Sequence, residues 1–181
     1  MMGKPDGARL LDVSADGFWS SFFAIVVALP ALAISWVKVA NELSPGVELS
    51  AARNALLPGL AFIDLCTWLV PLVGLALVAR LVGIGDRFVH YVVASNWGTV
   101  ITAWIMLPAA LLSFLVPSTR GDLAIAVGLA LFVLSMVLSW RLTNAVLNKG
   151  PAVASAVFAA MFLASLAVSL ALQSLFGIAA E

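Results

Sequence analysis

The sequence is poor in charge. Lys, Arg, Asp and Glu make up 10% of its 181 residues, whereas a soluble domain carries about a quarter charged residues. Apolar residues make up 64% of the chain, the opposite of a disordered composition. The apolar runs are also long and uninterrupted, unlike the short alternating segments of a membrane β-barrel. The composition therefore predicts an all-α, polytopic transmembrane helix bundle.

Cysteine and histidine are nearly absent. Cys66 and His90 are the only residues of their kinds, so the chain can form no intrachain disulfide and lacks the sulfur ligands of a structural zinc site. Nine basic residues balance nine acidic ones, and no basic patch of the kind that binds nucleic acid is indicated. We expect no metal, no cofactor and no nucleic-acid partner.

Five stretches are long enough to cross a bilayer, whose core of about 30 Å requires about 20 helical residues. They lie near residues 18–37, 55–78, 88–116, 123–140 and 152–178. Residues 1–16 are expected to form a tail, and residues 17–181 a single membrane domain. The glycine turn at Gly83–Asp86 and the Gly150–Pro151 pair separate spans. Such short connections predict that sequential spans are antiparallel neighbours.

The positive residues are distributed unequally between the two ends of this bundle. Six fall on the face with the amino terminus, namely Lys4, Arg9, Arg80, Arg87, Arg141 and Lys149. Three fall on the other face, namely Lys38, Arg53 and Arg120. Lys and Arg favour cytoplasmic loops. The expected topology has a cytoplasmic amino terminus and an external carboxyl terminus, in a cell inner (plasma) membrane.

Asp64 is the one charged residue predicted to lie deep in the membrane. A carboxylate at that depth needs a polar partner or water, and helical rise places Asn96 of the next span at a similar depth. Thr67 and Ser95 are expected nearby. These four residues form a candidate site that responds to a proton or another cation. The alternative is a purely structural hydrogen bond of a protonated Asp64.

Polar and aromatic residues gather at predicted span ends. Arg87, His90 and Tyr91 share one helical face and are interpreted as an interfacial cluster, with a proton relay as the alternative. Trp140 and Arg141 end the fourth span and are similarly interpreted as an interfacial anchor, with a specific lipid or partner contact as the alternative.

The fifth span carries a stripe of small residues that recur every four positions, Ala152, Ala156, Ala160 and Ala164. Small residues at this spacing allow close helix packing in lipid. We expect the stripe to contact another helix of the same chain, although a second copy would satisfy the pattern too.

The sequence contains no motif for catalysis. It has no phosphate-binding loop, no Gly-x-Ser-x-Gly elbow and no His-Glu-x-x-His, and Asp64 is the only acid available inside the membrane. We therefore expect a protein that is not an enzyme.

Two segments resemble the Yip1-domain family of small five-span membrane proteins. They are Arg87-Phe88-Val89-His90-Tyr91, which opens the third span, and the stretch from Ser139 to Ala152, in which a basic segment precedes an alanine-rich helix. The resemblance covers roughly residues 55–175. It implies a cytoplasmic amino terminus and an external carboxyl terminus, with no catalytic residues. The long amino-terminal region of the eukaryotic members is missing.

Together these patterns predict a non-catalytic, membrane-organising or accessory protein of the Yip1-like type, which associates with the lipid bilayer and with itself or another membrane protein. The alternative is a small proton- or cation-coupled transporter, or a transporter subunit, with its polar site at Asp64 and Asn96. A water-accessible cavity that reaches Asp64 would favour transport, because a structural carboxyl is expected to be closely packed.

Overall fold

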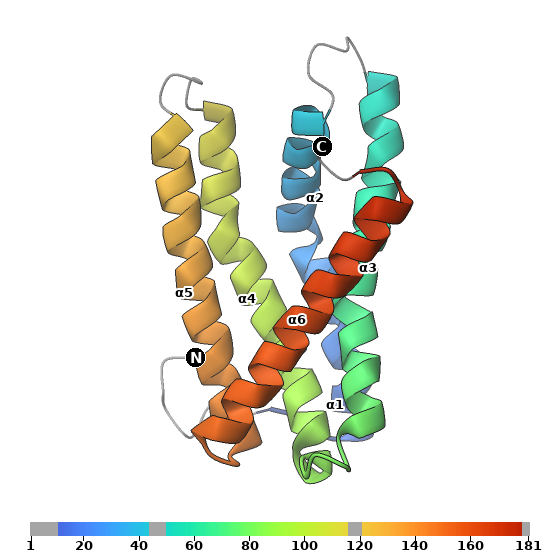
Figure 1. Ribbon diagram of the computed structural model, residues 1–181, viewed down its shortest axis with the longest axis vertical. Coiled ribbons are helices and arrows are strands. Elements are labelled where there is room, and N and C mark those ends of the chain that lie inside the picture. Colours follow the sequence, from blue (N-terminus) through green and yellow to red (C-terminus); the bar gives the residue numbers. More distant parts are fainter. Residues whose placement is uncertain (1–10, 44–49, 116–120, 179–181) are drawn as a thin grey trace.

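The computed structural model describes residues 11–43, 50–115 and 121–178. All regular elements of these residues are helices (Figure 1). In chain order they are α1 (Ala15–Ser20), η2 (Ser21–Phe23), α2 (Ala24–Leu43), α3 (Ser50–Val78), η3 (Gly85–Arg87), α4 (Phe88–Leu115), α5 (Gly121–Leu147) and α6 (Pro151–Leu175). The predicted all-α class is confirmed.

Five helical segments are long and apolar enough to cross a membrane. They cover Ala15–Leu43, Ala55–Val78, Gly85–Ser113, Leu123–Leu147 and Pro151–Leu175. Large apolar side chains point outward along them; Leu77, for example, is 77% exposed and Ile125 is 70% exposed. An outward apolar surface of this kind suits a hydrocarbon solvent. The chain is a polytopic membrane protein with five spans.

Local sequence signals set several helix ends. Ser14 caps α1, because its hydroxyl accepts a hydrogen bond from the Gly17 amide at 3.0 Å. α5 continues past the expected span end at Trp140 and stops at Leu147, where Asn148 and Gly150 take positive φ values of 50° and 91°. Neither glycine nor proline occurs between Trp140 and this turn, so the polar segment after Trp140 remains helical. Most of the expected tail, and the loops around residues 44–49 and 116–120, lie outside the described residues.

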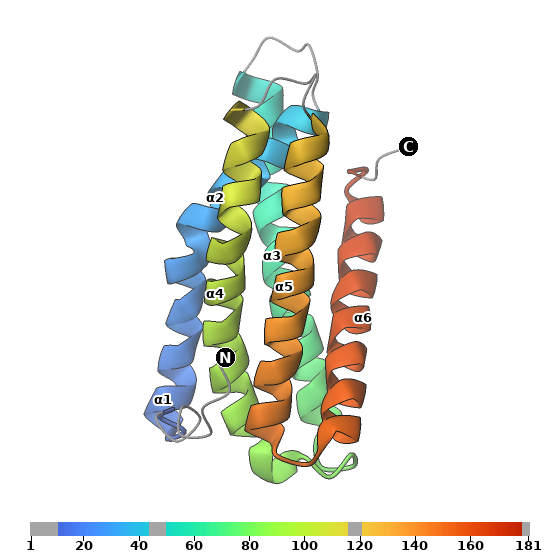
Figure 2. The same cartoon turned by 90° about the vertical axis from the view of Figure 1, so that its left-hand side faces the viewer.

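The spans do not all pack in sequential order. α4 packs on α2 and α5, while α3 packs on α6 and α2. α6 begins beside α5 and crosses diagonally to the far end of α3 (Figures 1 and 2). α3 and α4 are joined by a short connection, but their backbones do not pack closely. These two sequential spans are neighbours through their side chains, which meet in the Trp68–Asn96 hydrogen bond and in a shared apolar cluster.

Apolar clusters lie toward the two ends of the bundle. One cluster joins the end of α3, the starts of α4 and α6 and the end of α5, and it includes Leu72, Tyr91 and Leu147. The other joins the ends of α2 and α6 to the first half of α3 through Ala40, Ile63 and Ile178. The middle of the bundle, between these clusters, is where polar groups gather.

A buried polar chain ties the first span to α3 and α4. The Asn96 amide donates to the Ser21 hydroxyl at 2.9 Å, and its oxygen accepts from the Trp68 indole at 3.1 Å. Asn96 and Ser21 are completely buried. Since a buried amide without partners is costly, this chain fixes how α4 faces both neighbours.

Replacing Asn96 with alanine is expected to lower the free energy of unfolding by about 1–3 kcal/mol, because it leaves the Trp68 indole without its partner and removes the bond to Ser21, whose hydroxyl then keeps only the Phe18 carbonyl. Reversible unfolding in mixed detergent micelles measures the change. Asn144→Ala is the matched control, since the Asn144 side chain on α5 makes no hydrogen bond among the described residues and lies outside this chain of bonds. Equal stability of wild type and Asn96→Ala would contradict this role.

Candidate functional site

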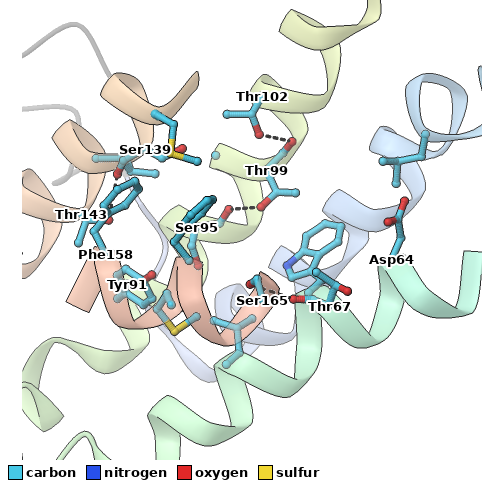
Figure 3. A pocket seen from close by; sticks show the side chains of 18 residues that line it. Asp64, Thr67, Tyr91, Ser95, Thr99, Thr102, Ser139, Thr143, Phe158 and Ser165 are labelled. Atoms are coloured by element: carbon cyan, nitrogen blue, oxygen red, sulfur yellow. Dashed lines mark hydrogen bonds between the residues drawn. The ribbon is translucent and has the colours of Figure 1, made fainter. Parts of the chain in front are cut away.

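A cavity of about 370 Å³ lies in the middle of the bundle. Four helices, α3 to α6, supply nearly all of its wall, and Leu32 of α2 completes it. Figure 3 shows the polar side chains that face this space, with Asp64 on the side opposite Thr143 and Phe158. The volume is in the range of small-molecule sites, which begin at about 300 Å³.

Asp64 is the only charged residue in the cavity wall. It is the middle residue of α3. Its Oδ2 accepts a hydrogen bond of 2.6 Å from the indole Nε1 of Trp36 on α2, which is a short, charge-assisted geometry when the carboxylate is ionised. The side chain is only partly buried and faces the cavity. Asp64 is thus anchored on one side and open on the other.

Hydroxyl groups form most of the remaining polar wall. They belong to Thr67, Tyr91, Ser95, Thr99, Thr102, Ser139, Thr143 and Ser165. Several of them donate their hydrogen to a backbone carbonyl of their own helix. Ser95 donates to Val92, Thr99 to Ser95 and Thr102 to Thr99, all at 3.0 Å.

Hydroxyl groups on the other helices also donate to backbone carbonyls. Thr143 donates to the Ser139 carbonyl at 2.9 Å, and Ser165 of α6 donates to the Thr67 carbonyl of α3 at 3.2 Å. A hydroxyl has one donor hydrogen and two acceptor lone pairs. Once the hydrogen is committed to the backbone, only acceptor capacity is left for the cavity.

The contact between Ser165 and Thr67 also places α6 over the cavity. It joins the middle of α6 to α3 one turn from Asp64. The Thr67 hydroxyl oxygen itself is buried and has no hydrogen-bond partner among the described residues. The end of the cavity near Asp64 therefore contains one carboxylate and one unused hydroxyl.

The four residues of the predicted polar site separate into two groups. Asp64, Thr67 and Ser95 line the cavity, whereas Asn96 does not. Asn96 is buried against Ser21 and Trp68, and Asp64 bonds to Trp36 instead. The expected pairing of Asp64 with Asn96 is thus replaced by two separate tryptophan contacts, because α3 and α4 are held apart by the cavity.

The predicted interfacial cluster is also divided. Arg87 is partly exposed at the end of the bundle, while Tyr91 is buried in an apolar cluster and hydrogen-bonds with Thr143. The His90 Nδ1 is buried without a partner among the described residues. Tyr91 thus belongs to the cavity wall, because its side chain points into the bundle.

Trp140 and Arg141 lie inside α5 rather than at its end. The Trp140 indole donates to the Ser155 hydroxyl of α6 at 3.0 Å, and Arg141 is exposed. Trp140 therefore holds the beginning of α6 against α5, in addition to any role at the membrane interface.

The alanine stripe of α6 faces away from the bundle over most of its length. Ala152, Ala156 and Ala160 are exposed, and Ala164 is partly exposed. The buried side of the helix contains Ala154 and Val157 instead. The expected contact of the first three alanines with another helix of the same chain is therefore wrong.

The hydroxyl wall and the two phenylalanines of α6, Phe158 and Phe162, were not predicted from the sequence. A signal for the wall is nevertheless present: Ser95, Thr99 and Thr102 recur at intervals of four and three residues, as do Ser139 and Thr143 at four. Such spacing places side chains on one helical face. In an apolar helix, a hydroxyl face of this kind indicates an inward surface.

These features define a five-span membrane protein with a polar cavity inside its bundle. Comparisons with protein-family models, with curated proteins and with solved structures find no match to this chain. Its function is therefore argued from the cavity.

Two serines one turn apart on α5 test whether water reaches the cavity. In a Cys66→Ser background, Ser139→Cys is expected to react with a small water-soluble thiol reagent, because Ser139 lines the cavity. Ser135→Cys is expected to be protected, since Ser135 is 8% exposed and lies outside the cavity wall. Labelling rates in lipid bilayers measure the difference. Equal protection at both positions would show that the cavity is closed to water.

Proposed function

We propose that the protein binds a cation inside the membrane and exchanges it across the bilayer, either as a small transporter or as the membrane subunit of one. The observation that supports this function is the cavity of about 370 Å³ with Asp64 in its wall. A charged residue deep in a membrane bundle generally marks an ion or substrate path. A carboxyl with only a structural role would be surrounded by packed side chains.

The charge of the wall favours a positive ligand. Asp64 supplies the single formal charge, and the wall contains no Lys, Arg or His. In surroundings of low dielectric constant an opposite charge is strongly attracted and a like charge is repelled. The backbone-bonded hydroxyls add acceptor oxygens that can bind the donor groups of a cation or of its water shell.

Asp64 can serve one cation at a time. Its Oδ2 is held by Trp36, which fixes the direction of the carboxylate, and the remaining oxygen is available to a proton or another cation. Competition between the two for this oxygen would couple their movements in opposite directions. We place the amino terminus in the cytoplasm of a cell with a plasma (inner) membrane, a proposal supported by the unequal distribution of Lys and Arg.

An exchange assay tests this function. Proteoliposomes with an acidic interior carry a dye that reports the pH gradient, and Na⁺, K⁺ or tetramethylammonium is added outside. At least one of these cations is expected to dissipate the gradient in wild type, because it displaces protons from Asp64. Asp64→Asn is expected to respond like protein-free liposomes. The substitution keeps an oxygen that can accept from Trp36, so the fold is preserved.

Asp86→Asn is the matched control. Asp86 pairs with Lys149 at 3.0 Å at the end of the bundle and is outside the cavity wall, and an exposed pair of this kind contributes little to stability. This variant is expected to exchange cations like wild type. Absence of a response to all three cations, or an unchanged response in Asp64→Asn, would contradict the function.

A second candidate function is association with another membrane protein, as expected of a non-catalytic, Yip1-like accessory protein. The outward position of Ala152, Ala156 and Ala160 favours it, because an exposed small face lets a second helix approach closely in lipid. The occupant that we propose for this face is α6 of a second copy.

Cysteine cross-linking tests this association. In the Cys66→Ser background, Ala156→Cys is expected to give an oxidised dimer in the membrane, while Ala154→Cys is expected to remain monomeric because Ala154 is completely buried. Gel electrophoresis without reducing agent distinguishes the two. A monomer in both cases would remove the second candidate.

A further inference from the structure

We propose that the ligand of the cavity is an organic ammonium compound with an aromatic or apolar portion. Its charged group would lie at Asp64, and its apolar portion would pack on Phe158 and Phe162 of α6. This assignment rests on the proposed cation-binding function and names the chemical class of the cation.

The distribution of the acceptor oxygens disfavours a bare metal ion. Metal cations are bound by oxygen ligands that converge on one point. Here the hydroxyl side chains of α4 extend from Tyr91 to Thr102, roughly 16 Å of helix, and Asp64 lies on the opposite side of the cavity from Thr143 (Figure 3). Acceptors dispersed in this way suit an extended ligand.

Aromatic side chains provide the second half of the site. Phe158 and Phe162 stack with their ring centroids 6.5 Å apart and an interplanar angle of 14°, and both line the cavity. Trp68 and Tyr91 also belong to the wall. Faces of aromatic rings attract ammonium groups, most strongly where water is excluded. The combination of one carboxylate with several rings is the chemistry that recognises an organic ammonium.

Helical spacing sets the distance between the phenylalanines and the carboxylate. Ser165 contacts the Thr67 carbonyl, and Thr67 is one turn from Asp64. Phe162 precedes Ser165 by one turn, and Phe158 is one further turn away on the same face of α6. Because α3 and α6 run in opposite directions, Asp64 and the two rings lie on opposite sides of this contact. A ligand whose ammonium group contacts Asp64 must therefore extend roughly 9 Å along the bundle to reach Phe162 and roughly 15 Å to reach Phe158.

The wall of the cavity reaches the outer, lipid-facing surface of the bundle at Phe162, which marks the rim. Phe162 is the one exposed residue of the wall, at 39%, and it belongs to the outward-facing part of α6. Leu163 beside it is 60% exposed. An amphiphilic ammonium compound concentrates in the bilayer through its apolar portion, so it reaches this rim from the lipid.

Calorimetric binding tests the assignment with the full chain in detergent micelles and with empty micelles as the blank. The probes are 6-phenylhexyltrimethylammonium, which is long enough to join Asp64 to the rings of α6, and its neutral counterpart, in which carbon replaces nitrogen. Wild type is expected to bind the ammonium compound and not the neutral one. Asp64→Asn is expected to weaken ammonium binding about tenfold or more, because a contact with a charged acceptor is lost.

The phenylalanines have their own variants and control. Phe162→Leu and Phe158→Leu keep an apolar side chain and remove the ring, and each is expected to weaken binding of the ammonium probe about three- to tenfold, because the aromatic contact with its apolar portion is lost. Phe132→Leu on α5 changes a ring outside the cavity wall and is expected to bind like wild type. Thermal unfolding of each variant confirms that it is folded.

The ammonium assignment and the cation-binding function are overturned by different results. No binding of 6-phenylhexyltrimethylammonium, or equal binding of its neutral counterpart, overturns the ammonium assignment. If Na⁺ or K⁺ still exchanges through Asp64 in that case, the cation-binding function stands. If neither binding nor exchange depends on Asp64, both the assignment and the function are wrong.

Discussion

The structure depends on one constraint: a polar group inside a bilayer must find its partner within the protein or in enclosed water. Between helices, the described part of the bundle meets the constraint mainly with tryptophan. Four indole N–H groups donate from one helix to another, Trp36 to Asp64, Trp68 to Asn96, Trp104 to the Val27 carbonyl and Trp140 to Ser155. A large ring with a single donor can fill space between helices and still satisfy an acceptor. Each contact therefore sets both the spacing and the facing of two helices.

The cavity follows from this spacing. Trp68 spans from α3 to the buried Asn96 of α4, and the backbones of these helices do not pack closely. α6 crosses the resulting space from α5 to α3, where Ser165 meets the Thr67 carbonyl. Hydroxyl side chains in the wall commit their hydrogens to backbone carbonyls and keep their lone pairs free. Together with Asp64, they place acceptor oxygens in the space between two apolar clusters that lie toward the ends of the bundle.

The sequence predicts the class of this fold well, because the length of a helix that crosses a bilayer is set by hydrocarbon thickness. Five helices occur where five apolar stretches lie, and Asp64 stands out by the cost of a carboxylate in lipid. Neighbour relations are less accessible. Trp36 looks like an interfacial residue by its position near a span end, yet it bonds to Asp64. Its role depends on how α2 is offset and tilted against α3, which hydropathy does not encode.

The outward alanines of α6 illustrate the same limit. A stripe of small residues indicates that a close contact is sterically allowed, but it does not indicate which face of the helix the bundle buries. In α6 that face contains Val157 and the wall residues Phe158 and Met161. Likewise, the hydroxyls at four-residue spacing on α4 and α5 acquire meaning only when the two helices are placed around one space.

We propose that Asp64, in the middle of α3, faces water inside the membrane while Trp36 holds its other side. Solid-state NMR in lipid bilayers tests this most directly, by following magnetisation from mobile water to a carboxyl carbon labelled in aspartate. Asp64→Asn identifies the signal. Rapid transfer of magnetisation from water to the Asp64 carboxyl carbon is expected. Transfer to this carbon that is as slow as transfer to the methyl groups of the apolar clusters would show that Asp64 does not face water.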